Sequence, residues 1–192
     1  MEKGLVIKST GSRYRVLYGD EDIAECTIRG KFREKGLKTT NPVAVGDNVL
    51  FEFEGKSGSG VITEVLQRKN YILRKASNLS RETQIIAANI DQVFLMITMI
   101  MPETPREFID RFLMTAEAYR IPASLIINKT DLYGNDELEK MNQLISVYRN
   151  IGYECFPASV AGCSGIDILR DKMKGKINLL AGNSGVGKTT LL

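Results

Sequence analysis

The segment from Gly182 to Thr189 limits the possible folds of this chain more than any other segment does. Its residues, Gly-Asn-Ser-Gly-Val-Gly-Lys-Thr, match the phosphate-loop pattern G-x-x-x-x-G-K-[ST] in full and directly follow an apolar run at 177–181. In this pattern the glycines let backbone N–H groups converge on phosphate oxygens, and the following helix presents its positive N-terminal end. The segment therefore predicts a strand, a loop and a helix of an α/β domain that binds a phosphorylated ligand.

Individual residues of this loop have distinct expected contacts. Lys188 is expected to reach the β and γ phosphates of a nucleotide and to stabilise their charge, and the Thr189 hydroxyl is expected to ligate Mg²⁺. The complete set expected to bind the nucleotide here is Gly182, Asn183, Ser184, Gly185, Val186, Gly187, Lys188, Thr189 and Thr190.

A second motif, Asn128-Lys129-Thr130-Asp131, follows the apolar run at 124–127 and matches the N-K-x-D element of GTPases. Guanine offers N1–H and a 2-amino group side by side, so one carboxylate at Asp131 can accept from both. Adenine has an acceptor at N1, and such a site rejects it. The stem of Lys129 is expected to lie over the base, and Asn128 is expected to tie this loop to the phosphate loop.

A third element, Ser159-Val160, follows the apolar run at 154–156 and resembles the GTPase Ser-Ala loop, whose backbone N–H binds guanine O6. Val160 stands where alanine is usual, which a backbone donor tolerates. All three loops follow predicted parallel strands, where ligands bind in open α/β sheets. Their order is that of a circularly permuted GTPase, because the phosphate loop comes last.

Hydrophobic periodicity divides the chain into two domains. Short strand-like runs at 5–8, 14–18, 23–27, 48–54 and 61–66 predict a small all-β barrel, for which the oligonucleotide/oligosaccharide-binding (OB) type is the leading candidate. After residue 90, apolar strands alternate with helical patterns, as in a parallel sheet covered on both faces. We expect an OB domain at 1–67, a linker at 68–88 and an incomplete permuted GTPase domain at 89–192.

Basic residues concentrate in the first part, where residues 1–75 hold 14 Lys and Arg against 10 Asp and Glu. Together with interleaved aromatic residues, this charge suits contacts to a nucleic-acid backbone and its bases, although a solvated loop remains an alternative. The candidate RNA contacts are Arg29, Lys31, Phe32, Arg33, Lys35, Lys38, Arg68 and Lys69.

Composition excludes several other classes. The chain has no histidine and three cysteines without a Cys-x-x-Cys pair, which excludes a Cys/His zinc site and a Ser-His or Cys-His nucleophile within these residues. No apolar run approaches the ~20 residues of a membrane-spanning helix, and the start lacks the apolar core of a secretory signal. A cytoplasmic protein without membrane contact is expected.

With the permuted motif order, the chain resembles the bacterial small ribosomal subunit biogenesis GTPase A family. Segments similar to those of the family occur along all 192 residues, at 29–33, 45–49, 68–74, 89–93 and 109–113. The resemblance implies a GTPase that is stimulated by the small ribosomal subunit, acts late in its maturation and touches ribosomal RNA with its barrel. It implies GTP or GDP and Mg²⁺ as ligands, and a monomer is expected.

The resemblance also identifies what these residues lack. The switch threonine, the Asp-x-x-Gly element that senses the γ-phosphate and the family's C-terminal zinc-binding domain are missing, so zinc is expected only in that missing domain. We therefore interpret the chain as a fragment with little or no GTP hydrolysis of its own. Two alternatives stay open: a nucleotide-regulated RNA-binding assembly factor without significant hydrolysis, and an adenine-using NTPase, against which Asp131 argues.

Overall fold

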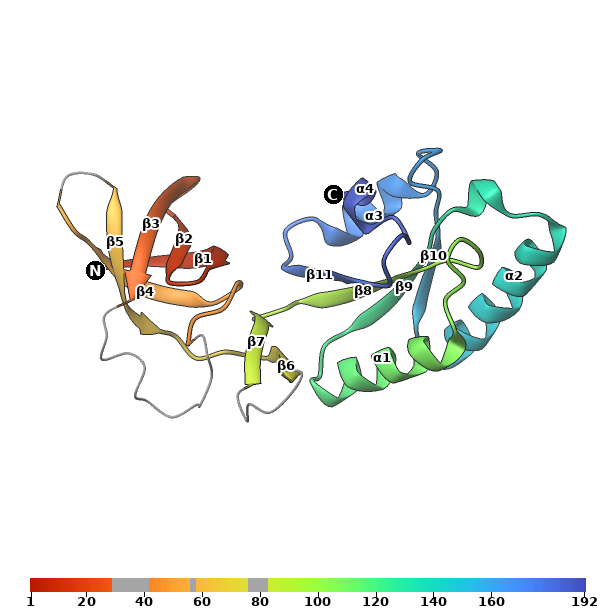
Figure 1. The fold of residues 1–192 in the computed structure, drawn as a ribbon, viewed down its shortest axis with the longest axis horizontal. Coiled ribbons are helices and arrows are strands. Elements are labelled where there is room, and N and C mark those ends of the chain that lie inside the picture. Colours follow the sequence, from red (N-terminus) through yellow and green to blue (C-terminus); the bar gives the residue numbers. More distant parts are fainter. Residues whose placement is uncertain (29–41, 56–57, 76–82) are drawn as a thin grey trace. The chain divides into compact units, whose positions relative to one another are not determined.

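The computed structural model describes residues 1–28, 42–55 and 58–192 except 76–82. The chain divides into two compact units, Met1–Ile90 and Asp91–Leu192. Among the described residues, none of the helices combines the length and the apolar character needed to cross a membrane. Figure 1 labels the helices and strands of both units.

The first unit contains the predicted barrel. Its strands are β1 (Glu2–Thr10), β2 (Arg13–Tyr18), β3 (Asp22–Ile28), β4 (Asn48–Phe53) and β5 (Ser59–Val65), closed in the order β1-β2-β3-β5-β4. β3 and β5 pair in parallel and the other neighbours pair antiparallel. Alternate side chains such as Tyr14, Val16, Val49 and Phe51 fill the interior. The OB-like closed barrel predicted from the sequence is confirmed.

The segment 68–88 differs from the linker that its polar composition suggested. It contains the antiparallel strands β6 (Tyr71–Lys75) and β7 (Thr83–Ala88), and the boundary between the compact units falls after Ile90. Asn89 Nδ2 donates to the backbone oxygen of Gly46 (2.8 Å), and the Ala88 amide donates to Val45 (2.9 Å). These long-range hydrogen bonds, which no local pattern encodes, attach the two-stranded ribbon to the barrel unit.

The second unit is a parallel four-stranded sheet between helices, as predicted. Its elements are β8 (Gln92–Ile97), α1 (Arg106–Ala118), β9 (Ala123–Ile127), a 3₁₀ turn (Thr130–Leu132), α2 (Asn135–Asn150), β10 (Glu154–Pro157), α3 (Ile166–Met173), β11 (Asn178–Ala181) and α4 (Lys188–Leu191). The sheet order is β10-β9-β8-β11, so the last strand of the unit pairs with the first. This neighbourhood fits the permuted motif order.

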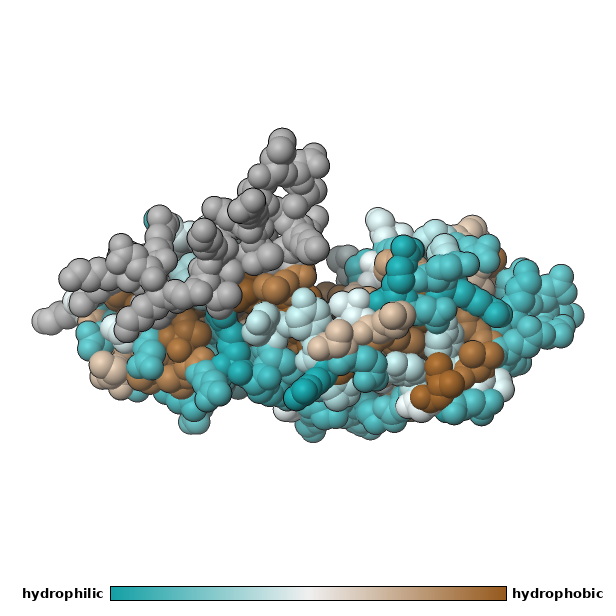
Figure 2. All heavy atoms as spheres, turned by 90° about the horizontal axis from the view of Figure 1, so that it is seen from below, coloured by the Kyte–Doolittle hydropathy of each residue, from teal (hydrophilic) through white to brown (hydrophobic). Residues whose placement is uncertain are grey.

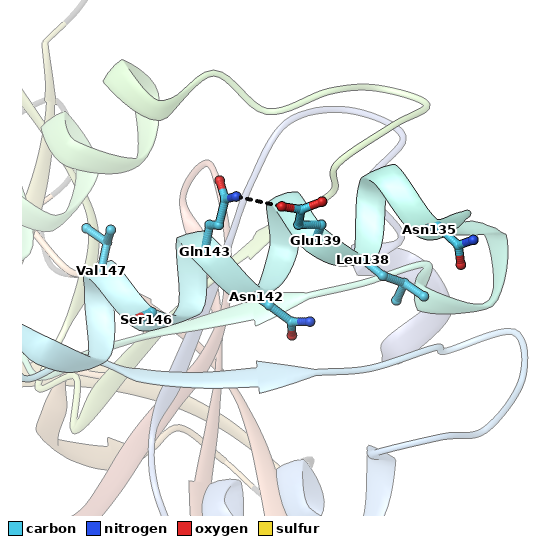
Figure 3. Close-up of a pocket in the computed structure, with 7 residues that line it drawn as sticks. All are labelled: Asn135, Leu138, Glu139, Asn142, Gln143, Ser146 and Val147. Carbon is cyan, nitrogen blue, oxygen red and sulfur yellow. Dashed lines mark hydrogen bonds between the residues drawn. The ribbon is translucent and has the colours of Figure 1, made fainter.

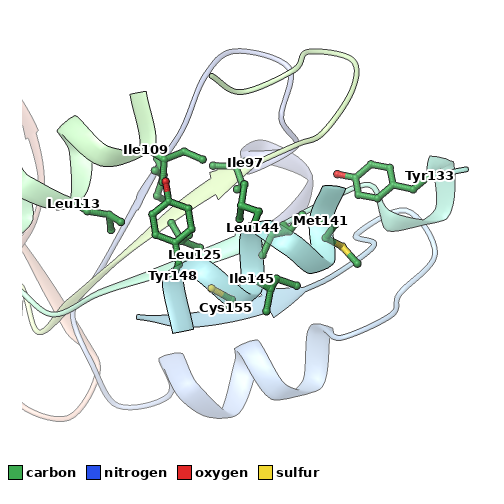
Figure 4. Close-up of a cluster of buried hydrophobic side chains, with 12 residues drawn as sticks. Ile97, Ile109, Leu113, Leu125, Tyr133, Met141, Leu144, Ile145, Tyr148 and Cys155 are labelled. Carbon is green, nitrogen blue, oxygen red and sulfur yellow. The ribbon is translucent and has the colours of Figure 1, made fainter. Parts of the chain in front are cut away.

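Both faces of this sheet are covered, which explains why β8 is apolar at almost every position. Leu95, Ile97 and Leu125 pack with α1 and α2 on one face (Figure 4). Phe94 and Met96 pack with α3 on the other face. Some large apolar side chains remain exposed on the helices of this unit, namely Met114, Leu138, Val147 and Ile168. Figure 2 shows a described surface that is mostly hydrophilic with smaller hydrophobic areas.

Candidate nucleotide site

The three predicted loops leave the same edge of the sheet. Residues 128–131 follow β9, residues 158–164 follow β10 and residues 182–187 follow β11. Since these strands are parallel, their carboxyl ends lie together. β8 separates β9 from β11 in the sheet, so a side chain has to cross the end of β8 to connect the first and third loops.

Asn128 makes that connection. Its side chain is buried, donates through Nδ2 to the Val186 backbone oxygen (2.8 Å) and accepts through Oδ1 from the Val160 amide (3.0 Å). Its own amide donates to the Ile97 oxygen at the end of β8 (2.9 Å). One side chain thus joins all three loops, which agrees with the expected link to the phosphate loop and extends it to a third partner.

Glycines in the phosphate loop are required by the packing beneath it. A Cβ atom at Gly182, where φ is +143°, would lie 2.3 Å from the backbone oxygen of Met96. A Cβ atom at Gly187, where φ is +105°, would lie 2.3 Å from Asn128 Nδ2. Glycine is therefore needed both for the backbone conformation and for the close approach to β8 and to Asn128.

The lysine of the phosphate loop lies over its own loop. Lys188 begins α4, and its Nζ donates to the backbone oxygens of Gly182 (2.8 Å) and Asn183 (2.7 Å). Thr189 and Thr190 follow in the same turn and are exposed. The loop N–H groups, the lysine ammonium and the threonine hydroxyls therefore occupy one small region at the start of α4.

This region fits a nucleotide-bound Mg²⁺. Within the described part of the chain, no group of three or more His, Cys, Asp or Glu side chains forms a cage for a metal. Mg²⁺ in phosphate sites takes one or two protein ligands and completes its shell with phosphate oxygens and water. The exposed hydroxyl of Thr189, beside the phosphate loop, suits that role.

The loop after β9 holds Asp131 at the sheet edge. Asp131 lies in the 3₁₀ turn, is exposed and accepts a short hydrogen bond from Ser159 Oγ. Ser159 Oγ in turn accepts from the Gly162 amide (2.8 Å), and the Thr130 amide donates to Ala158 (3.2 Å). The Asp131 carboxylate is thus oriented by the loop after β10. The sequence predicted Ser159 as a nucleotide-binding residue and did not predict its hydrogen bond to Asp131.

Lys129 has left-handed backbone, with φ at +67°, and its Nζ donates to the Met101 backbone oxygen. The Val160 amide, for which a contact to guanine O6 is expected, donates to Asn128 Oδ1 (3.0 Å). The physical reason is that the buried amide oxygen of Asn128 needs a donor, and the Val160 N–H is the one within reach.

Tyr133 is a site residue that the sequence reasoning missed. Its Oη accepts from the Met99 amide (2.9 Å) and donates to the Asn128 backbone oxygen. Burial raises the pKa of this phenol, so it stays protonated and able to donate. The one local signal for Tyr133 in the sequence is its position two residues after Asp131, and no motif identifies a tyrosine at that position as part of a nucleotide site.

The candidate RNA contacts fall into two groups. Arg29, Lys31, Phe32, Arg33, Lys35 and Lys38 lie outside the described residues. Arg68 is engaged within its own unit: its guanidinium binds the fully buried carboxylate of Asp47 at 2.6 Å and donates to the Pro42 oxygen (2.8 Å). That pairing gives Arg68 a structural role, which a count of surface charge does not anticipate. Lys69 is exposed.

Two other hollows in the second unit offer less chemistry. One is lined by α2 alone, with Glu139 as its single charged residue and a Gln143–Glu139 hydrogen bond (3.2 Å) (Figure 3). The other lies at the opposite edge of the sheet, where Lys172 and Glu154 form an ion pair (2.7 Å). Neither brings together a glycine loop, an amide cradle and a carboxylate, so the carboxyl edge is the candidate site.

Comparisons with known proteins point to one family. The family model described as RsgA GTPase matches residues 65–192, and the model described as RsgA N-terminal domain matches residues 3–62. Proteins named small ribosomal subunit biogenesis GTPase RsgA, from Bacteroides fragilis and Phocaeicola vulgatus, are 50% and 52% identical to this chain over 190 residues. Each match covers 99% of the chain, which spans 61% of the relative's length.

Solved structures agree in fold. The crystal structure of YjeQ from Thermotoga maritima has a TM-score of 0.80 and 37% identity, covering 99% of this chain and 63% of that one. The structure of YloQ, described as a circularly permuted GTPase, has a TM-score of 0.76 and 29% identity, covering 99% of this chain and 62% of that one. The permuted order deduced from the three loops is thus found in a solved structure of the same fold.

Proposed function

Because the chain belongs to the RsgA GTPase family, whose model matches residues 65–192, we propose that it binds guanine nucleotides at the carboxyl edge of its parallel sheet and takes part in GTP hydrolysis. The observation that carries this proposal is the pair of hydrogen bonds from the Asn128 side chain, one to the phosphate loop and one to the loop after β10. A base and its phosphates need both regions held at a constant separation.

The phosphates are proposed to bind over residues 182–187 at the start of α4. Lys188 Nζ, held above the loop by two backbone oxygens, supplies the positive charge for the β and γ phosphates. The Thr189 hydroxyl would hold a Mg²⁺ ion bound with the nucleotide, and that ion would supply positive charge to the phosphate oxygens. The loop N–H groups orient the phosphate oxygens and exclude alternative positions.

The base is proposed to bind beside the loop after β9. Asp131, oriented by Ser159, accepts from guanine N1–H and the 2-amino group, and the stem of Lys129 lies along the base plane. Adenine would place a lone pair against the carboxylate, which such a site rejects strongly. Thr130 lies between Lys129 and Asp131 in the sequence, and its amide donates to the Ala158 backbone oxygen, which anchors the turn.

The physiological target is proposed from the relatives. Proteins at 50% identity are named small ribosomal subunit biogenesis GTPases, so we propose that this chain acts, as a cytoplasmic monomer, in late maturation of the small ribosomal subunit. Its OB domain, residues 1–67, is proposed to contact ribosomal RNA, and residues 89–192 are proposed to form the permuted GTPase domain. Lys69, Phe32 and the basic residues within 29–38 are the proposed RNA contacts.

Calorimetric titration with GDP, GTP and ATP in the presence of Mg²⁺ tests the nucleotide part. We expect GDP and GTP to bind and ATP to be rejected, and we expect Asp131→Ala to lose most of the preference for guanine over adenine. If the Asp131→Ala variant keeps that preference, the account of base selection is wrong. If the unaltered chain binds neither GDP nor GTP, the proposed nucleotide site is refuted.

Filter binding to small-subunit RNA tests the second part. Affinity for RNA is expected to fall by orders of magnitude between low and moderate salt, because bound lysines and arginines release counterions from the phosphate backbone. A flat response to salt would refute backbone contacts by the basic residues and favour the solvated-loop alternative. Repeating the measurement with GDP and GTP shows whether nucleotide regulates RNA binding.

A further inference from the structure

Tyr133 joins the hydrophobic core to the guanine-type loop through one hydroxyl group. Its ring belongs to the buried cluster between the sheet and helices α1 and α2, and Figure 4 shows it at one end of that cluster. The side chain is 9% exposed, so its hydroxyl depends on protein partners. Those partners are the Met99 amide (2.9 Å), beyond the end of β8, and the Asn128 backbone oxygen, at the end of β9.

The second of these bonds closes the loop that carries the base-binding residues. Asn128 and Tyr133 are its two ends, and within it the Leu132 amide donates to the Lys129 oxygen (2.9 Å). Lys129 has left-handed backbone, a conformation that costs a non-glycine residue free energy and needs surrounding contacts to persist. Holding the Asn128 carbonyl fixes the peptide that leads into Lys129 and the turn that contains Asp131.

We infer that Tyr133 is a positioning residue for base recognition: its hydroxyl sets the place of Asp131 and Lys129 without touching the nucleotide. The inference rests on the proposed guanine site. The residue acts through Asn128, whose backbone it binds and whose side chain reaches the phosphate loop and the Val160 amide. Loss of the Tyr133 hydroxyl is therefore expected to displace the base-binding residues and to weaken the hydrogen bonds that link the loops.

Tyr148 provides a matched control. It belongs to the same buried cluster, is 4% exposed and donates its hydroxyl hydrogen to Asp110 Oδ1 (2.8 Å). Its hydroxyl partner, Asp110, lies on α1 and on none of the three loops. Tyr148→Phe and Tyr133→Phe therefore remove the same atom from the same core, and they differ in whether the lost bond holds the nucleotide site.

The test measures Kd values for GDP and for inosine diphosphate (IDP), which lacks the 2-amino group that Asp131 is proposed to bind. We expect Tyr133→Phe to weaken GDP binding about tenfold, since two backbone groups lose a partner. The ratio of the IDP Kd to the GDP Kd should decrease several-fold toward one, because a displaced Asp131 carboxylate no longer accepts a hydrogen bond from the 2-amino group. Tyr148→Phe should leave both values unchanged, while both variants lower the melting temperature.

The outcomes separate the inference from the proposed function. If the unaltered chain does not bind GDP, the nucleotide site itself fails. If it binds GDP and the two variants behave alike, or the Tyr133→Phe ratio stays at the unaltered value, Tyr133 has a structural role and the inference is overturned. If Tyr133→Phe does not fold, amide hydrogen exchange of the unaltered chain provides the test. The inference requires that GDP slow the exchange of the Met99 amide together with that of the Val160 amide. Protection of the Val160 amide alone overturns the inference.

Discussion

Replacing Asn128 with alanine removes the side chain on which the three loops converge. The variant leaves the Val186 carbonyl without its donor and the Val160 amide without its acceptor, in a region where Asn128 is 3% and Val186 0% exposed. An unsatisfied buried polar group costs about 1–3 kcal/mol, which applies in full to the Val186 carbonyl, whereas the Val160 amide lies in a partly buried bond and adds less. The phosphate loop and the base loop then lose their fixed separation.

Part of this cost appears as lost stability and part as lost affinity. If about 2 kcal/mol falls on the bound state, the Kd for GDP rises about thirtyfold. Calorimetric titration with GDP measures that change, and urea unfolding measures the loss of stability. Asn142→Ala is the control, because Asn142 is an exposed asparagine on the outer side of α2 (Figure 3). A change in the GDP Kd below about threefold for Asn128→Ala, or equal to that of Asn142→Ala, would refute the reasoning.

Two further substitutions test other parts of the structure. Arg68→Ala should lower the free energy of unfolding, measured by urea titration, by about 3–5 kcal/mol, because it leaves the buried Asp47 carboxylate unpaired. Arg15→Ala is the control, since the side chains of its ion pair are 43% and 62% exposed. It should lower the free energy of unfolding by under about 1 kcal/mol in the same titration. Equal losses would contradict the structural role of Arg68. Gly182→Ala should weaken GDP binding at least about tenfold in calorimetry, because the new Cβ would clash with the Met96 backbone oxygen. Gly152→Ala is the control, because Gly152 also has a positive φ but has open space around its Cβ, and it should leave the GDP Kd unchanged. Similar GDP affinities for these two variants would show that the close approach of Gly182 to Met96 is not needed for nucleotide binding.

Much of the fold could be predicted because its signals are local. The change from a period of two to a period near 3.6 separates the barrel from the α/β unit, and β8 is apolar at every position after Gln92 because it is buried on both faces. The ribbon of β6 and β7 could not be read in this way. Its polar residues resemble a linker, and what attaches it to the barrel is the hydrogen bond between Asn89 and Gly46, 43 positions apart.

The sequence by itself determined the composition of the candidate site, because residues 182–188 and 128–131 are contiguous motifs that each follow a strand. The tertiary structure alone decided how these motifs are held together. The Val160 amide binds Asn128, and the Tyr133 hydroxyl bridges Met99 and Asn128. The Val160–Asn128 bond joins the ends of β10 and β9, and the Tyr133 hydroxyl joins the ends of β8 and β9. These contacts depend on the assembled sheet, which no single segment encodes.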